Sequence, residues 1–195
     1  MRYFDLERLK DKLFFTVEDV AENFNIKVAS SRILCYRYAK KGIFIRLKKD
    51  FYILAYKWEN LGWEDFFILS NYLQVPSYIS FMTALSFYEV STQIQRNFFE
   101  NASLKRSLSF NVKGVVFNFY KLKRDYYFDF LKKENFFIAT KEKAFVDSVY
   151  LYSLGRYRLD FSSLDLDKLD KKRIKNILKK FPQRTKNIVK EICKI

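Results

Sequence analysis

Three closely spaced helix signals near the start of the chain constrain its fold more than any other sequence feature. The charged run Asp5–Lys12 favours a short first helix. Thr16, followed three residues later by Asp19, forms a capping pattern that begins a second helix. A third helix is predicted from Val28 to Lys41, ending at Gly42, where a left-handed C-cap is easiest. Three short helices therefore fit into about 40 residues.

Two β-rich runs follow the third helix directly. Ile43–Leu47 and Phe51–Ala55 each favour a strand, and Lys48–Asp50 provides a turn between them. Three helices followed by a hairpin is the element order of a winged helix-turn-helix. We therefore predict such a DNA-binding domain over residues 1–60, with the boundary near Trp58–Trp63, where a new amphipathic run begins.

The third helix has one face suited to a core and another suited to DNA. Ser31, Leu34, Cys35 and Tyr38 have the helical spacing of an inward stripe. Residues 27–49 contain eight Lys or Arg and no acid. Side chains that reach base edges or phosphates are predicted at Lys27, Ser30, Arg32, Tyr36, Arg37 and Lys40 on the helix, and at Arg46, Lys48 and Lys49 on the hairpin. The alternative is a solvated basic helix on a lysine-rich protein.

The rest of the chain, residues 61–195, mixes helix and strand signals, so the predicted fold class is α+β: a winged helix-turn-helix followed by a mixed α/β domain with C-terminal helices. Extended segments are predicted at 76–80, 107–112 and 115–121, with 126–130 as a strand or a helix start. Helices are predicted at 81–88, after the Thr140 cap through 144–151, at 166–181 and from Pro182 to 195.

Composition excludes several kinds of chemistry. The chain contains no histidine, so it has no Ser-His-Asp triad, no Cys-His dyad and no mixed Cys/His zinc site. Its two cysteines, Cys35 and Cys193, stand far apart, which favours a reducing cytoplasm. No apolar run is long enough to span a bilayer. We expect no metal, no cofactor and no membrane partner, and the net charge of +15 favours a nucleic-acid partner.

Three stretches together resemble the AbiEi family of antitoxins from type IV toxin–antitoxin (abortive infection) operons. The first is the winged module, from Phe15–Ala21 through Lys40–Leu47 to Phe51–Leu54. The second, Pro76–Tyr88, is similar to the family's Tyr-Ile-Ser segment and the Ser/Thr-Ala-Leu helix that follows it. The third, Ala139–Asp147, is similar to the family's Glu-Lys-Ala…Asp helix.

The resemblance implies a non-enzymatic protein that binds operator DNA, represses its own operon and counteracts a nucleotidyltransferase toxin. It marks Tyr78, Ser80, Lys143 and Asp147 as antitoxin-motif residues. Lys143 and Asp147 also have the spacing of an ordinary i, i+4 ion pair. Two positions depart from the family pattern: Glu89 stands where a glycine is expected after the Ala-Leu helix, and the turn at 48–50 lacks one.

Three alternatives remain open from the sequence. In the first, the winged module is a transcription regulator without a toxin partner. In the second, it binds protein rather than DNA. In the third, Asp165 and Asp167 hold a magnesium ion in a nucleic-acid-processing enzyme, although their position before a lysine-rich helix favours a capping role. The chain has neither a Glu-x-Lys triplet nor a glycine-rich phosphate loop.

Overall fold

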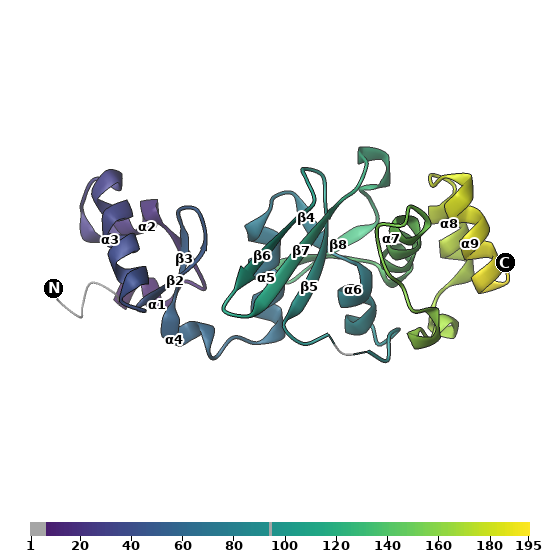
Figure 1. The fold of residues 1–195 in the computed structure, drawn as a ribbon, viewed down its shortest axis with the longest axis horizontal. Helices are drawn as coiled ribbons and strands as arrows, with labels where there is room; N and C mark the ends of the chain where they lie inside the picture. Colours follow the sequence, from purple (N-terminus) through teal and green to yellow (C-terminus); the bar gives the residue numbers. More distant parts are fainter. Residues whose placement is uncertain (1–6, 94) are drawn as a thin grey trace. The chain divides into compact units, whose positions relative to one another are not determined.

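The computed structural model describes residues 7–93 and 95–195, and the chain divides into two compact units. The first unit ends at Leu69 and the second begins at Ser70. Both units contain helices and strands, so the fold is α+β (Figure 1). The division falls within helix α5 (Trp63–Leu73), a few residues beyond the boundary predicted near Trp58–Trp63.

The N-terminal unit contains short helices and a small sheet. Its elements before α5 are α1 (Glu7–Lys10), β1 (Phe15–Thr16), α2 (Val17–Phe24), α3 (Val28–Lys40), β2 (Phe44–Lys48), β3 (Phe51–Leu54) and α4 (Ala55–Trp58). The predicted capping box is present, because Thr16 Oγ accepts from the Asp19 amide while the Asp19 carboxylate accepts from the Thr16 amide at 2.7 Å. The three helices and the hairpin therefore occur in the predicted order.

The strands form a three-stranded antiparallel sheet in the order β1-β3-β2. Strand β1 has only two residues and is not predicted by the sequence pattern. Pairing between β2 and β3 shifts register between Arg46 and Lys48, so the hairpin has a bulge near its tip. Asp50 occupies the left-handed turn position, with φ 58°, where a glycine was expected, and aspartate tolerates this conformation better than most residues.

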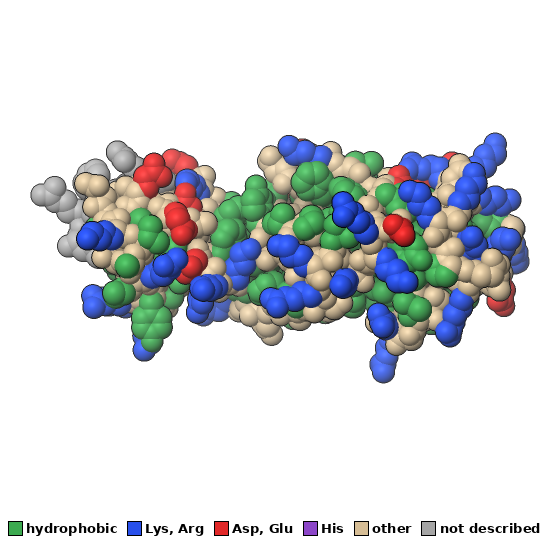
Figure 2. Space-filling view, turned by 90° about the horizontal axis from the view of Figure 1, so that it is seen from above, with side chains coloured by type: hydrophobic (Ala, Val, Ile, Leu, Met, Phe, Trp, Pro, Cys, Tyr) green, Lys and Arg blue, Asp and Glu red, His purple; other side chains and the backbone are tan. Residues whose placement is uncertain are grey.

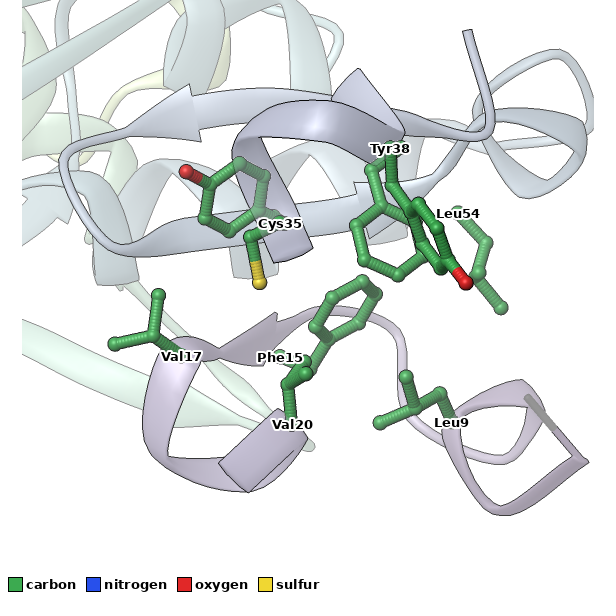
Figure 3. Packing of buried hydrophobic residues seen from close by; sticks show 9 residues of the cluster. Leu9, Phe15, Val17, Val20, Cys35, Tyr38 and Leu54 are labelled. Atoms are coloured by element: carbon green, nitrogen blue, oxygen red, sulfur yellow. The ribbon is translucent and has the colours of Figure 1, made fainter. Parts of the chain in front are cut away.

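A core of aromatic and aliphatic side chains holds this unit together. The labelled side chains in Figure 3 point toward one another from α1, β1, α2, α3 and β3. Cys35 is fully buried, Tyr38 is nearly so, and the ring centroids of Phe15 and Phe44 lie 4.8 Å apart. The predicted inward stripe of α3 is confirmed, since Ser31, Cys35 and Tyr38 are buried and Leu34 packs against the same core.

The C-terminal unit contains a six-stranded mixed sheet and the remaining helices. Its strands are β4 (Ser77–Ile79), β5 (Phe98–Ser103), β6 (Leu108–Val112), β7 (Val115–Lys121), β8 (Phe130–Lys133) and β9 (Phe136–Ala139), in the spatial order β6-β7-β5-β4-β9-β8. Its α-helices after α5 are α6 (Phe81–Phe87), α7 (Lys141–Ser153), α8 (Lys171–Leu178) and α9 (Gln183–Cys193). Three short 3₁₀ turns complete it: η2 (Arg124–Tyr126), η3 (Phe161–Ser163) and η4 (Leu166–Lys168).

Helix α7 is the centre of the packing in this unit. It contacts α6, β9, α8 and α9 (Figure 1), and only Lys141 and Tyr152 among its residues escape burial. The predicted Thr140 cap is present, with the Thr140 hydroxyl accepting from the Lys143 amide at 3.3 Å. A helix enclosed on several sides holds its polar side chains away from water, and this determines where the motif residues lie.

Two predictions for this unit need correction. The segment 166–181 is not one helix: it begins with η4, and α8 starts only at Lys171. The break follows from Asp170, which takes an extended N-cap conformation and accepts from the amides of Lys172 and Arg173. The segment 126–130 is neither one strand nor a helix start, because η2 ends at Tyr126 and β8 begins at Phe130.

Across the described ranges 7–93 and 95–195, no helix combines the length and apolar character that a membrane span needs.

Candidate nucleic-acid interface

The outer face of α3 carries the polar and basic side chains that the sequence predicted there. Lys27, Ser30, Arg32, Tyr36, Arg37 and Lys40 are all exposed. Ile33 lies among them, and it and Tyr36 are the most exposed large hydrophobic side chains of the helix, each at 55%. The face therefore combines cations, a hydroxyl and one aromatic ring, which are the groups that contact base edges and phosphates in a major groove.

The opposite face fixes the orientation of α3. Ser31 Oγ donates to the backbone carbonyl oxygen of Val17, 2.7 Å away and at the start of α2, and both groups are buried. Cys35 packs into the core, and burial raises the pKa of its thiol to about 11, so the thiol stays protonated and unreactive. Because this face is anchored, the basic face of α3 is held outward as part of a rigid unit.

An ion pair connects α3 to the hairpin turn. The guanidinium of Arg32 lies 3.2 Å from the Asp50 carboxylate, and its Nε donates to the same oxygen at 3.3 Å. Arg32 is about half exposed, so the pair is worth about 1 kcal/mol or less. Its consequence is geometric: the pair sets the tip of the hairpin beside the outer face of α3.

Tyr36 and Lys40 form a second local arrangement, one helical turn apart. Lys40 Nζ lies 4.9 Å from the centroid of the Tyr36 ring. A hydrogen bond with Tyr36 raises the pKa of the Lys40 ammonium, so this group keeps its charge at every physiological pH. The exposed ring and the ammonium therefore form one surface element in the C-terminal part of α3.

The hairpin adds further positive charge. Arg46 Nε donates to the Lys48 carbonyl oxygen at 3.2 Å, across the bulge, and the Lys48 ammonium lies 4.9 Å from the centroid of the Phe51 ring. Lys49 projects from the turn and is exposed. All nine residues predicted for DNA binding thus lie on α3, at its N-cap or on β2 and the adjoining turn.

Between Lys27 and Leu54, the stretch that forms α3 and the hairpin, Asp50 is the one acidic residue. Helix α3 contains no acid, and Asp50 is already paired with Arg32. On the face of the molecule in Figure 2, the acidic side chains of the N-terminal unit gather in one strip, and Lys and Arg side chains lie on both units. The α3 and hairpin surface is therefore a local concentration of positive charge within a basic protein.

The four residues that the resemblance marked form a second cluster, inside the C-terminal unit. Tyr78 on β4, Ser80 after it, and Lys143 and Asp147 on α7 are all fully buried. The Tyr78 hydroxyl and Ser80 Oγ each donate to Asp147 Oδ2 at 3.0 Å. Lys143 Nζ forms an ion pair with Asp147 and donates to the Tyr78 hydroxyl at 2.9 Å. The structure thus brings together residues that are 65 or more positions apart in the sequence.

This cluster differs from an ordinary exposed i, i+4 pair. The Lys143 ammonium lies among the rings of Tyr78, Phe128 and Phe181, with centroid distances of 5.2 to 5.5 Å. Burial lowers the pKa of Lys143 and raises that of Asp147, while each partner counteracts the shift of the other. Because the four side chains are enclosed, they fix β4 to α7 and offer no surface to a partner.

The two aspartates considered for metal binding lie apart from this cluster. Asp165 is exposed and pairs with Lys168 at 3.9 Å, and Asp167 is exposed. The predicted capping role of these aspartates is wrong. Asp165 stands before η4 but makes no side-chain cap bond there, and the N-cap of α8 is Asp170. Within the described part of the chain, no three Cys, Asp or Glu side chains converge in an arrangement that would hold a metal ion.

Two polar residues that no sequence pattern predicted for a site have important positions. Asp50 pairs with Arg32, and Glu100 is buried in the central strand β5, where it accepts hydrogen bonds from two tyrosines. No sequence signal marked Glu100, because its partners Tyr120 and Tyr157 are 20 and 57 residues away.

A scan of the chain against protein-family models matches none, and a search of curated proteins also finds no match.

Proposed function

We propose that the N-terminal unit is a winged helix-turn-helix module that binds double-stranded DNA, with α3 in the major groove and the β2–β3 hairpin against the neighbouring phosphates. The observation that carries the proposal is the outer face of α3, where cations and hydroxyls project together from a helix that contains no acid. The Arg32–Asp50 pair supports it, because it sets the hairpin tip beside this face.

The residues divide into two roles under this proposal. Arg37, Ser30 and Tyr36 lie on the exposed side of α3, where side chains meet base edges, so they contribute sequence preference. Lys49, at the turn, meets phosphates and contributes affinity for any duplex. Arg32 has a mixed role, because its guanidinium already binds Asp50 and has fewer donors left for DNA.

We further propose that the chain is the antitoxin and autorepressor of a type IV toxin–antitoxin operon and counteracts a nucleotidyltransferase toxin. This half rests on the AbiEi resemblance. The hydrogen-bonded cluster of Tyr78, Ser80, Lys143 and Asp147 supports it, since the two C-terminal motifs that carry the resemblance meet there. The cluster's burial gives these residues a structural role, so they are not the groups that would contact a toxin.

The experiment for DNA binding is a salt-titrated mobility shift of the full chain on the DNA upstream of its own reading frame, beside a scrambled duplex of equal length. Arg37→Ala is expected to weaken binding to the upstream DNA by about 1–3 kcal/mol and to reduce the preference over the scrambled duplex. Lys49→Ala is expected to weaken binding to both duplexes and to lower the salt slope by about 1. Lys172→Ala, an exposed lysine of the C-terminal unit, is the matched control.

Unchanged affinity in both Arg37→Ala and Lys49→Ala would overturn the assignment of this interface. Equal and salt-sensitive binding of the unmodified chain to both duplexes would instead favour a module that binds protein. For the antitoxin half, the chain is co-expressed with the nucleotidyltransferase encoded beside it. If the chain restores growth of cells that express the nucleotidyltransferase, and Arg37→Ala restores it as well, the result supports a neutralising activity separate from DNA binding. If the unmodified chain does not restore growth, the result contradicts the antitoxin function.

A further inference from the structure

Helix α3 presents an isoleucine at the centre of its cationic outer face. Ile33 lies two residues after Ser31 and two residues before Cys35, and both of these side chains are fully buried. An α-helix advances about 100° per residue, so a side chain two positions from each of them points almost directly away from the core. The fold therefore turns Ile33 toward solvent.

Two neighbours on the same side of the helix extend this apolar surface. Ala29 lies one turn before Ile33 and Tyr36 lies one turn after it, and all three residues are exposed. Ile33 and Tyr36 are each 55% exposed, so more than half of the isoleucine surface stays open to solvent. The three residues Ala29, Ile33 and Tyr36 form a narrow apolar strip along the outer face of α3.

Cations flank this strip. The guanidinium of Arg32 is held toward the hairpin turn by its ion pair there, at 3.2 Å. Lys40 Nζ lies 4.9 Å from the centroid of the Tyr36 ring, and Arg37, four residues after Ile33, is exposed. Whatever contacts Ile33 must therefore also accommodate positive charge around it.

The surroundings of Ile33 decide which partner fits it. Single exposed isoleucines are common on protein surfaces, so exposure alone assigns no partner. An apolar surface of another protein would have to remove the neighbouring cations from water without replacing their hydration. The major groove of DNA instead offers phosphates and polar base edges to the cations, and one apolar group, the C5-methyl of thymine, projects into it. The charge around the strip therefore favours duplex DNA that contains thymine.

We propose that Ile33 contacts the C5-methyl group of a thymine in the major groove, so that the DNA bound by α3 has an A·T pair at a fixed position. This inference rests on the proposed DNA binding by α3 and adds the base that the helix prefers there. The hydroxyl of Ser30 and the guanidinium of Arg37 form hydrogen bonds, which a methyl group cannot provide. An isoleucine gains from the methyl, because the contact removes apolar surface of both groups from water.

The test replaces every thymine of the bound duplex by uracil. Uracil lacks only the C5-methyl group and keeps the hydrogen-bonding groups of thymine, so the comparison isolates the methyl. The DNA upstream of the reading frame is prepared in both forms, and mobility shifts of the full chain at one salt concentration measure the two affinities. We expect the unmodified chain to bind the uracil duplex about fourfold more weakly, which corresponds to the burial of one methyl group.

Two variants assign the effect to Ile33. Ile33→Ala is expected to weaken binding to the thymine duplex about fourfold and to bind the two duplexes within about twofold of each other. Ile43→Ala is the matched control: it makes the same change at an exposed isoleucine of the same unit, which precedes β2 at the end of the hairpin away from its turn. The control is expected to keep the full preference for thymine. Circular dichroism shows whether each variant is folded, and truncation of the exposed Ile33 leaves the core of the unit intact.

A preference for thymine that the unmodified chain and Ile43→Ala show and Ile33→Ala lacks supports the proposal. Equal binding of the two duplexes by the unmodified chain overturns it, and so does a preference that Ile33→Ala retains. In both cases the proposed DNA binding stands if Arg37→Ala still weakens binding to the thymine duplex, so the two failures are distinguishable. If the unmodified chain binds neither duplex, both proposals fail. If Ile33→Ala binds both duplexes like the unmodified chain but no longer restores growth beside the nucleotidyltransferase, the strip contacts a protein and thymine contact is overturned.

Discussion

Replacing Asp147 by asparagine removes one negative charge from a fully buried cluster without changing the shape of the side chain. The carboxamide oxygen still accepts from Tyr78 and Ser80, which donate to Oδ2 at 3.0 Å in the unmodified chain. The Lys143 ammonium, however, keeps only the Tyr78 hydroxyl, at 2.9 Å, and the faces of nearby rings. The variant therefore leaves the Lys143 ammonium, which is 0% exposed, without a counter-charge, and this lowers the stability of the folded chain.

The magnitude follows from this geometry. Removing one partner of a buried ion pair costs about 3–5 kcal/mol, which is a large part of the stability of a domain. Asp165→Asn is the matched control, because it makes the same chemical change in a pair with Lys168 whose members are nearly half exposed and 3.9 Å apart. The control is expected to cost about 0.5 kcal/mol or less.

Urea unfolding of the full chain, followed by circular dichroism, measures both variants. A double variant, Lys143→Met with Asp147→Asn, removes the stranded ammonium and is expected to recover most of the loss, giving a coupling energy above about 2 kcal/mol. The argument from buried charge is refuted if Asp147→Asn lowers the free energy of unfolding no more than Asp165→Asn does. It is also refuted if the loss in the double variant equals the sum of the losses in the two single variants.

Three further outcomes follow from single positions. Because burial raises the pKa of Glu100 to about 7, the folded chain binds a proton at this carboxyl more tightly than the unfolded chain does. The free energy of unfolding is therefore highest, as far as Glu100 determines it, below about pH 4.5, and it falls as the pH rises through 7. The loss is about 3 kcal/mol, and urea midpoints at pH 5 to 8 should fall in the unmodified chain and change less in Glu100→Gln. Glu89 has φ 56°, so Glu89→Gly should raise the free energy of unfolding by about 0.5–1 kcal/mol in urea melts, and a decrease would contradict the strain argument. Asp170→Ala removes the cap of α8 and should lower thermal stability by about 1 kcal/mol, whereas Asp170→Asn should retain most of it in the same calorimetric scan.

Local signals predicted the N-terminal unit well. The Thr16 and Asp19 capping box, the inward stripe of α3 and the hairpin after Gly42 depend on residues close together in the sequence, and each is confirmed. In the C-terminal unit, the position after the Ala-Leu helix departs from the pattern of the resemblance. Glu89 replaces the glycine expected there, and its positive φ shows that the backbone still has the left-handed conformation that glycine would favour.

The C-terminal unit was less predictable because its central strand does not have the composition of a strand. β5 reads Phe-Phe-Glu-Asn-Ala-Ser and buries Glu100, Asn101 and Ser103, which strand patterns place at the surface. Their partners come from distant segments: Tyr157 for Glu100, Ser70 for Asn101 and Gln74 for Ser103. A pattern that depends on tertiary hydrogen bonds is invisible to periodicity, and β5 was therefore not predicted.

The same reasoning separates the polar residues that maintain this fold from those available for function. Asp147 makes hydrogen bonds with Tyr78 and Ser80 and an ion pair with Lys143, and the four side chains are buried. A ligand could reach them only if the packing of β4 on α7 were broken. Glu100 is equally buried, but it also lines a pocket. Asp147 therefore maintains the fold alone, whereas Glu100, although its hydrogen bonds are also internal, lies in the lining of a pocket together with Arg156 and Arg158.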